Sequence, residues 1–207
     1  MPVSVIGRFL VLGIGWLVVL LVPWYYVAPM LSRPAVAVSA EIMAYLFNWV
    51  DEVEHVGTVA TLVTRIPVAV MQDGQRLVGV LTVEADFLIF GYGIALLWAL
   101  LLASRPRRLI VKGLIGSLAL IPFQVWGLCF QWLKDVLFRG GAATLDYVRW
   151  PGLVMDAIGF GYQLGYLVFT PTVPVLLWLA LDRRFMATLW LEASLAEQAD
   201  GAKGRQS

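Results

Sequence analysis

Long apolar runs separated by short polar stretches dominate the chain and set the predicted elements. A helix needs about 20 consecutive apolar residues to span a bilayer. Four runs reach or approach that length, namely residues 1–30, 87–103, 109–133 and 153–181. Inside lipid only helices and closed barrels satisfy their backbone polar groups. The pattern therefore predicts a mainly α-helical membrane protein built on a four-helix transmembrane bundle.

The first apolar run has a second interpretation, a cleaved signal peptide. The small residues at 35–37 and 38–40 resemble cleavage sites. Against cleavage, the run is much longer than the apolar core of a signal peptide, and Pro29 and Pro34 close it. We expect a retained helix. Under either interpretation the segment that follows, residues 31–86, is translocated.

Residues 36–53 show apolar side chains at helical spacing on an otherwise polar segment. Val38, Ile42 and Trp49 fall on one face, and acidic residues such as Glu41 occupy the remainder. The pattern predicts an amphipathic helix that is too polar to span a membrane. Such a helix lies along the outer leaflet or covers other helices. Binding of a partner is the alternative role.

Residues 58–84 have the pattern of a β-hairpin. Two alternating, β-branched runs flank Asp73-Gly74, and this dipeptide favours a tight hairpin turn. Pro67 removes one backbone donor, which makes the first strand an edge or introduces a bulge. A lone hairpin is marginal in water and needs a surface to pack on. We therefore expect residues 31–86 to form a small cap of an amphipathic helix plus a hairpin.

The distribution of charge predicts the orientation in the membrane. Lys and Arg near helix ends resist translocation, whereas acidic residues matter much less. Residues 104–108 are basic, and Arg183-Arg184 follow the last span, whereas residues 31–86 are mainly acidic. We expect a cytoplasmic loop at 104–108, a cytoplasmic tail at 182–207 and both chain ends inside. The cap and the 134–152 loop would then lie outside, and residues 192–207 would form a short helix with a disordered end.

Composition narrows the function classes further. Of the 207 residues 60% are hydrophobic and only 14% charged, which excludes a soluble enzyme, and the net charge of +1 gives no field for nucleic acid. Cys129 is the single cysteine and His55 the single histidine. An internal disulfide and a Cys/His zinc site are therefore excluded. We expect no metal and no cofactor.

Two amides lie within the predicted spans. Gln124 and Gln163 are at similar depth in neighbouring antiparallel spans and could hydrogen-bond to each other. Intramembrane amides serve either as structural contacts between helices or as substrate-facing groups. Pro122, Pro171 and Pro174 should kink the same two spans. Kinked spans with polar groups also occur in transporters, so a small oligomeric transporter or channel subunit is the alternative function.

Three segments stand in a recognisable order: a strand-like stretch at 80–86, residues 121–127 and residues 161–165. This order resembles a shortened exosortase, a membrane transpeptidase whose family uses a Cys, an Arg and a His. At the matching positions this sequence has no Cys around Asp86, no Arg near Gly127 and no His around Gln163. The nucleophile, the base and the group that stabilises the oxyanion are all missing. The resemblance therefore implies a protein without transpeptidase activity, and we predict no catalytic residue.

A closer resemblance rests on Trp24-Tyr25, Val83-Glu84 before Tyr92-Gly93, Pro122-Phe123-Gln124-Val125-Trp126-Gly127, Gly161-Tyr162-Gln163-Leu164-Gly165, and Leu177-Trp178-Leu179-Ala180-Leu181 before Arg183-Arg184-Phe185. With these segments the sequence resembles the exosortase H-associated membrane proteins, which accompany one exosortase subtype in Gram-negative bacteria. The resemblance covers most of the chain up to about Phe185.

The resemblance implies a multi-pass accessory protein of the bacterial inner membrane. Its expected partners are the lipid bilayer and an exosortase or the tailed substrate of that enzyme. We expect the cap to hold or present the substrate's C-terminal sorting signal. The candidate contact residues, for a partner or for the structure itself, are Gln124, Gln163, Glu84, Asp86 and Trp126.

Overall fold

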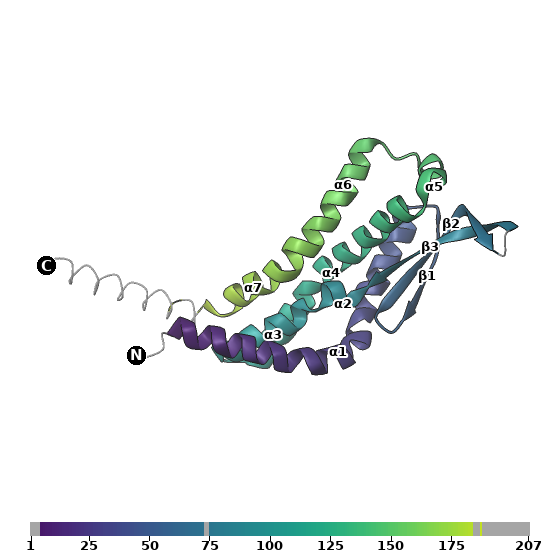
Figure 1. Cartoon of the computed structure of the whole chain (residues 1–207). Helices are drawn as coiled ribbons and strands as arrows, with labels where there is room; N and C mark the ends of the chain where they lie inside the picture. The colour runs from purple at the N-terminus through teal and green to yellow at the C-terminus, as the bar shows by residue number, and fades with distance from the viewer. Residues whose placement is uncertain (1–4, 73–74, 184–186, 188–207) are drawn as a thin grey trace, which may run out of the picture.

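Four long apolar helices and one small sheet make up the protein (Figure 1). The computed structural model describes residues 5–72, 75–183 and 187. In this part of the chain four helices are long and apolar enough to cross a membrane: Ile6–Leu46, Phe87–Ser104, Leu109–Arg139 and Gly152–Leu181. The prediction of four spanning helices is confirmed at this level. The predicted Asp73-Gly74 turn and nearly all of the predicted 182–207 tail lie outside the described residues.

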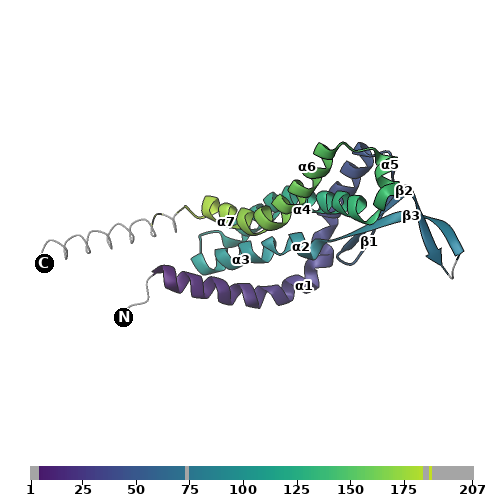
Figure 2. The same ribbon diagram turned by 45° about the horizontal axis from the view of Figure 1, so that its top comes forward.

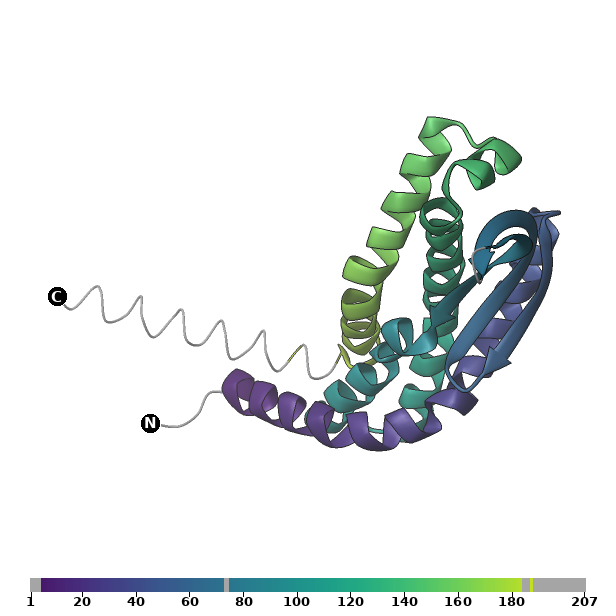
Figure 3. The ribbon, with the colours of Figure 1, turned by 45° about the vertical axis from the view of Figure 1, so that its right-hand side comes forward.

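The first helix, α1 (Val5–Leu46), is longer than the sequence predicted. Pro23, Pro29 and Pro34 lie within it rather than at its end. Each proline removes one helical hydrogen bond, and the helix bends instead of ending. Figure 3 shows its second half turning away from the first and running behind the sheet. The predicted separate helix at 36–53 is therefore wrong, because residues up to Leu46 continue α1.

The sheet has three antiparallel strands in the order β1-β2-β3 instead of the two predicted. The strands are β1 (Val50–Val56), β2 (Val59–Gln72) and β3 (Gln75–Asp86). The last residues of the predicted amphipathic helix therefore belong to β1, whose backbone groups pair with β2 from Val50↔Thr64 to Val56↔Val59. Between β2 and β3 the register shifts from Val63 to Pro67, as expected where proline offers no donor.

One face of the sheet packs on the helices. Along β2 the buried residues alternate as Ala60, Leu62, Thr64 and Ile66. This period of two places them on one face. The Trp132 indole N–H of α4 donates to the Ala60 carbonyl at 2.9 Å. The distal part of the hairpin extends beyond the helices (Figure 1).

The remaining helices follow directly from the sheet. The second span consists of α2 (Phe87–Gly91) and α3 (Gly93–Ser104), and a short connection leads to α4 (Leu109–Arg139). The predicted loop at 134–152 contains the last turns of α4 and a further helix, α5 (Gly141–Val148). The last span is α6 (Gly152–Gln163), a π-helical stretch η1 (Leu164–Phe169) and α7 (Thr170–Leu181).

Close helix contacts depend on glycine at several positions of the bundle. α4 packs against α1, α3 and α6, and α3 packs against α1 and α7. A Cβ on Gly127 of α4 would collide with the Phe90 ring, and a Cβ on Gly161 of α6 with the Phe130 ring. In lipid, helices associate through van der Waals packing and small residues that permit close approach. These contacts fix α4 as the central helix of the bundle.

Candidate functional site

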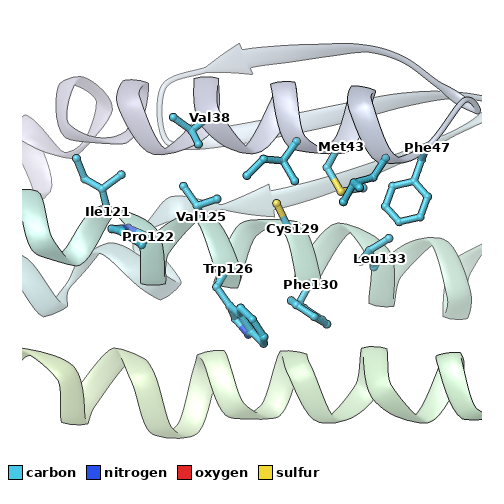
Figure 4. A pocket seen from close by; sticks show the side chains of 12 residues that line it. Val38, Met43, Phe47, Ile121, Pro122, Val125, Trp126, Cys129, Phe130 and Leu133 are labelled. Carbon is cyan, nitrogen blue, oxygen red and sulfur yellow. The ribbon is translucent and has the colours of Figure 1, made fainter.

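An apolar groove runs between α1 and α4 at the end of the bundle that carries the sheet. Its volume is about 460 Å³. Figure 4 shows side chains of α1 and α4 converging on it. The lining residues are Val38, Ile42, Met43, Leu46 and Phe47 from α1, and Ile121, Pro122, Val125, Trp126, Cys129, Phe130 and Leu133 from α4.

The helical repeat explains how the sequence builds this groove. On both helices the lining residues recur three or four positions apart, so they share one face. The small residue Ser39 brings the backbone of α1 close to α4, where the Cys129 thiol lies 3.9 Å from the Ser39 carbonyl oxygen. This contact lies at the groove itself, because Cys129 is one of the lining residues.

Trp126 closes the groove on the side of α6. Its indole N–H donates to the Gly161 carbonyl at 2.8 Å. Its ring stacks on Phe130 with centroids 4.5 Å apart. Both rings point away from α1 towards the last span (Figure 4). Trp126 therefore joins α4 to α6 and forms part of the wall of the groove.

A second pocket, of about 820 Å³, adjoins the groove and shares Leu46 and Phe47 with it. Its wall is an aromatic cluster. Phe47 lies 5.0 Å from Trp49 and 6.0 Å from Trp150, measured between ring centroids. The groove thus opens from a wholly apolar stretch into an aromatic mouth beside the sheet. We call the first pocket the α1–α4 groove and the second pocket its aromatic mouth.

The predicted pairing of Gln124 with Gln163 is absent. Gln124 is 3% exposed, and neither its amide oxygen nor its amide nitrogen has a hydrogen-bond partner among the described residues. Gln163 is exposed at the end of α6. The rotation of each helix about its axis decides which neighbour an amide meets. The structure does not bring these two candidates together.

Glu84 and Asp86 lie where the sheet meets the second span. The Asp86 carboxylate accepts the Leu88 backbone N–H at 2.9 Å and so caps α2. The Glu84 side chain is exposed, while its backbone carbonyl lies 3.5 Å from the Gln131 amide nitrogen. Asp86 thus has a structural role, while the Glu84 carboxylate beside it forms no ion pair within the described part of the chain.

The sequence comparison with exosortases drew attention to Asp86, Gly127 and Gln163. Asp86 caps a helix, Gly127 lies under the Phe90 ring and Gln163 is exposed. His55 lies in β1, where its Nε2 is 3.0 Å from the Ser32 hydroxyl of α1. In the described part of the chain no group of three His, Cys, Asp or Glu side chains could hold a metal ion.

Trp126 is the one candidate contact residue that lines the groove, and sequence reasoning missed other residues that shape the site. Trp150 and Phe47 meet only after folding, and no motif marked either of them. Gln131 and Trp132 of α4 contact backbone carbonyls of the sheet. Their positions within an apolar run do not indicate which backbone groups they contact. A recurrence of apolar residues on one face of residues 121–133 was visible, although such a stripe is equally typical of helix packing.

Comparison with known families settles the relationship. Residues 3–185 match the family described as exosortase H-associated membrane protein. The chain belongs to this family. Its membership confirms the resemblance inferred from the sequence. No curated protein and no solved structure matches the chain.

The family match and the helices agree on the class of protein. This exosortase H-associated membrane protein is a multi-pass membrane protein, since four of its described helices could span a bilayer. The family description suggests association with an exosortase H system and an accessory, non-catalytic role. An exosortase is the partner that this description suggests.

Proposed function

We propose that the protein is a non-catalytic accessory of an exosortase H sorting system in the inner membrane of a Gram-negative bacterium. In this role it holds the apolar C-terminal sorting helix of a secreted substrate in the α1–α4 groove and presents it to the exosortase. The observation that carries the proposal is the open apolar groove in a chain of this family. No residue of the chain is assigned a chemical step.

The length of the groove suits a helix as its occupant. On α4 its lining extends from Ile121 to Leu133. At 1.5 Å per residue this is about 18 Å, more than half of the ~30 Å hydrocarbon core. A helix in lipid gains little from the hydrophobic effect and associates by shape and close packing. A concave apolar surface of this length supplies that packing.

The aromatic mouth suits the place where such a helix leaves the bilayer. Trp and Tyr rings favour the membrane interface because one end is apolar and the other polar. Tyr45 and Tyr147, 90% and 50% exposed, flank the buried Trp49. In the proposed orientation the sheet and this mouth are extracytoplasmic, and residues 104–108 are cytoplasmic. The Glu84 carboxylate would then face the same compartment as the mouth.

The transporter alternative has no specific support in the geometry. It was suggested by the expected kinks in the last two spans and by their glutamines, of which Gln124 is buried and Gln163 is exposed. The kink expected in the last span coincides with η1, where the Thr170 hydroxyl donates to the Gly165 carbonyl at 2.8 Å. The Gly165 carbonyl also accepts the Thr170 backbone N–H, so both bonds stay within the last span.

Filling the groove tests the proposed function. Ile42, 37% exposed, lines the groove, whereas Val18 on the same helix is 63% exposed elsewhere. In a host with the sorting system, Ile42→Trp should reduce processing of tailed substrates and their copurification with the protein. Val18→Trp should leave both unchanged. Normal processing in the Ile42→Trp strain, or in a strain that lacks the gene, would contradict the proposal.

A further inference from the structure

A basic pocket lies at the opposite end of the bundle from the sheet. Its volume is about 430 Å³. It forms where α7 ends beside the connection between α3 and α4, close to the start of α1 (Figure 2). Its lining residues are Arg107, Arg108, Lys112, Ala180, Leu181 and Arg183. Two segments about 70 positions apart in the chain therefore place four cations around one cavity.

The connection that carries Arg107 and Arg108 is conformationally constrained. Arg105 and Arg108 adopt left-handed conformations with φ of 50° and 60°, which non-glycine residues seldom take. Such strain persists only where the surroundings fix it. The Trp178 indole N–H donates to the Ser104 hydroxyl at 3.1 Å and ties α7 to the start of the connection. The arginines are thus presented by a short, constrained connection between two spans.

The charges of the pocket are not balanced within the described chain. Asp182, 3% exposed, lies 3.4 Å from the Lys112 ammonium. Arg107, Arg108 and Arg183 form no ion pair with any described residue. Four cations against one carboxylate leave a surplus of three positive charges in the pocket. The buried carboxylate neutralises Lys112 and leaves the three guanidinium groups for another anion.

We propose that this pocket binds the phosphate group of an anionic phospholipid. Guanidinium groups recognise phosphate through paired N–H donors, and basic pockets between spans take phospholipid headgroups. Apolar surface for the acyl chains lies next to the cations, since Ile110 and Val111 of α4 are 65% and 51% exposed. Free phosphate is the other source of the same chemistry. The proposal is independent of the sorting function.

The test is a lipid titration of the detergent-solubilised full-length protein, followed by native mass spectrometry. The wild type should bind phosphatidylglycerol more tightly than phosphatidylcholine. The triple variant Arg107→Gln, Arg108→Gln, Arg183→Gln should bind phosphatidylglycerol about tenfold or more weakly. The control variant Arg33→Gln, Arg65→Gln, Arg149→Gln removes three cations at the other end and should change the affinity by less than about twofold. Inorganic phosphate is added as a competitor.

Each outcome decides the proposal. If millimolar phosphate competes with phosphatidylglycerol, the pocket is a general phosphate site. If phosphate does not compete and phosphatidylglycerol binds tightly, the pocket recognises the lipid headgroup. Both results support a phosphate-binding pocket. Equal affinity of wild type and triple variant for phosphatidylglycerol would overturn it, as would equal affinity of the wild type for the two lipids. If the triple variant does not fold, Arg107→Gln alone, at an exposed side chain, gives the same comparison.

Discussion

Gln124 is a buried amide of α4 without a hydrogen-bond partner among the described residues. It is buried on the face of α4 that also carries Ser117 and Gln131, each seven positions away. Ser117 accepts a hydrogen bond from the Trp98 indole, and Gln131 lies near the Glu84 carbonyl. Gln124 has no such partner. A buried amide without partners costs about 1–3 kcal/mol.

Replacement of Gln124 by methionine tests whether its amide lacks a hydrogen-bond partner inside the bundle. Methionine has a similar length and no polar group to desolvate, so Gln124→Met should raise the free energy of unfolding in detergent by about 1–3 kcal/mol. Gln163→Met, at an exposed position, serves as the control and should change it by less than about 0.5 kcal/mol. A loss of stability in Gln124→Met would mean that the amide has a partner inside the bundle.

The sequence indicates the depth of a residue in a span but not its neighbours. Gln124 and Gln163 lie in adjacent helices, yet the first faces the interior and the second faces outward. A difference of one or two residues in helix rotation separates these outcomes. Asp86 was predictable in a different way, because an aspartate directly before an apolar run is a common helix cap.

At the scale of elements, the main difference from prediction lies between residues 31 and 56. Pro29 and Pro34 favoured the end of a helix, but α1 continues through both. Within β1 the valines recur every third residue, as Val50, Val53 and Val56, so no alternation marks a strand. Pairing with β2 determines this strand. The hairpin was predictable because its alternation is local, whereas the third strand depends on a contact that only the fold creates.

Trp132 holds the sheet on the bundle, so its replacement should release the sheet first. The side chain is fully buried and bonds to the Ala60 carbonyl. Trp132→Ala should cost about 3–5 kcal/mol of unfolding free energy and increase hydrogen exchange most in residues 50–66. Trp132→Phe keeps an aromatic ring and should cost about 1–2 kcal/mol. Exchange that rises equally in α3 and in the sheet would contradict this role.

At the scale of the whole molecule, the sequence indicated the spans and the family, whereas the groove emerged only from the packing. A long apolar run predicts a helix that crosses the bilayer, because a helix satisfies its backbone polar groups internally in lipid. The groove depends on the bend of α1 and on the contact between Ser39 and Cys129. Neither the bend nor this contact follows from a local sequence pattern. The basic connection at 104–108 was visible in the sequence, but its convergence with Arg183 was not.

The proposed orientation predicts which residues a membrane-impermeant thiol reagent reaches. In a Cys129→Ala background, Glu52→Cys should be labelled in cells with a permeable outer membrane, because β1 would face the periplasm and this side chain is exposed. Arg107→Cys should be labelled only after the inner membrane is opened. The reverse pattern would place the sheet in the cytoplasm and contradict the proposed topology.

The most direct test of the central claim is site-specific photocrosslinking from the groove in cells that carry the sorting system. A photoreactive residue at Ile42 should crosslink to the tailed substrate, and the same residue at Val18 should not, because only Ile42 lines the groove. Adducts with the substrate that disappear when its C-terminal helix is deleted are the predicted result. Adducts with the exosortase alone, or no protein adduct from Ile42, would contradict the account of the groove as a holder of the sorting helix.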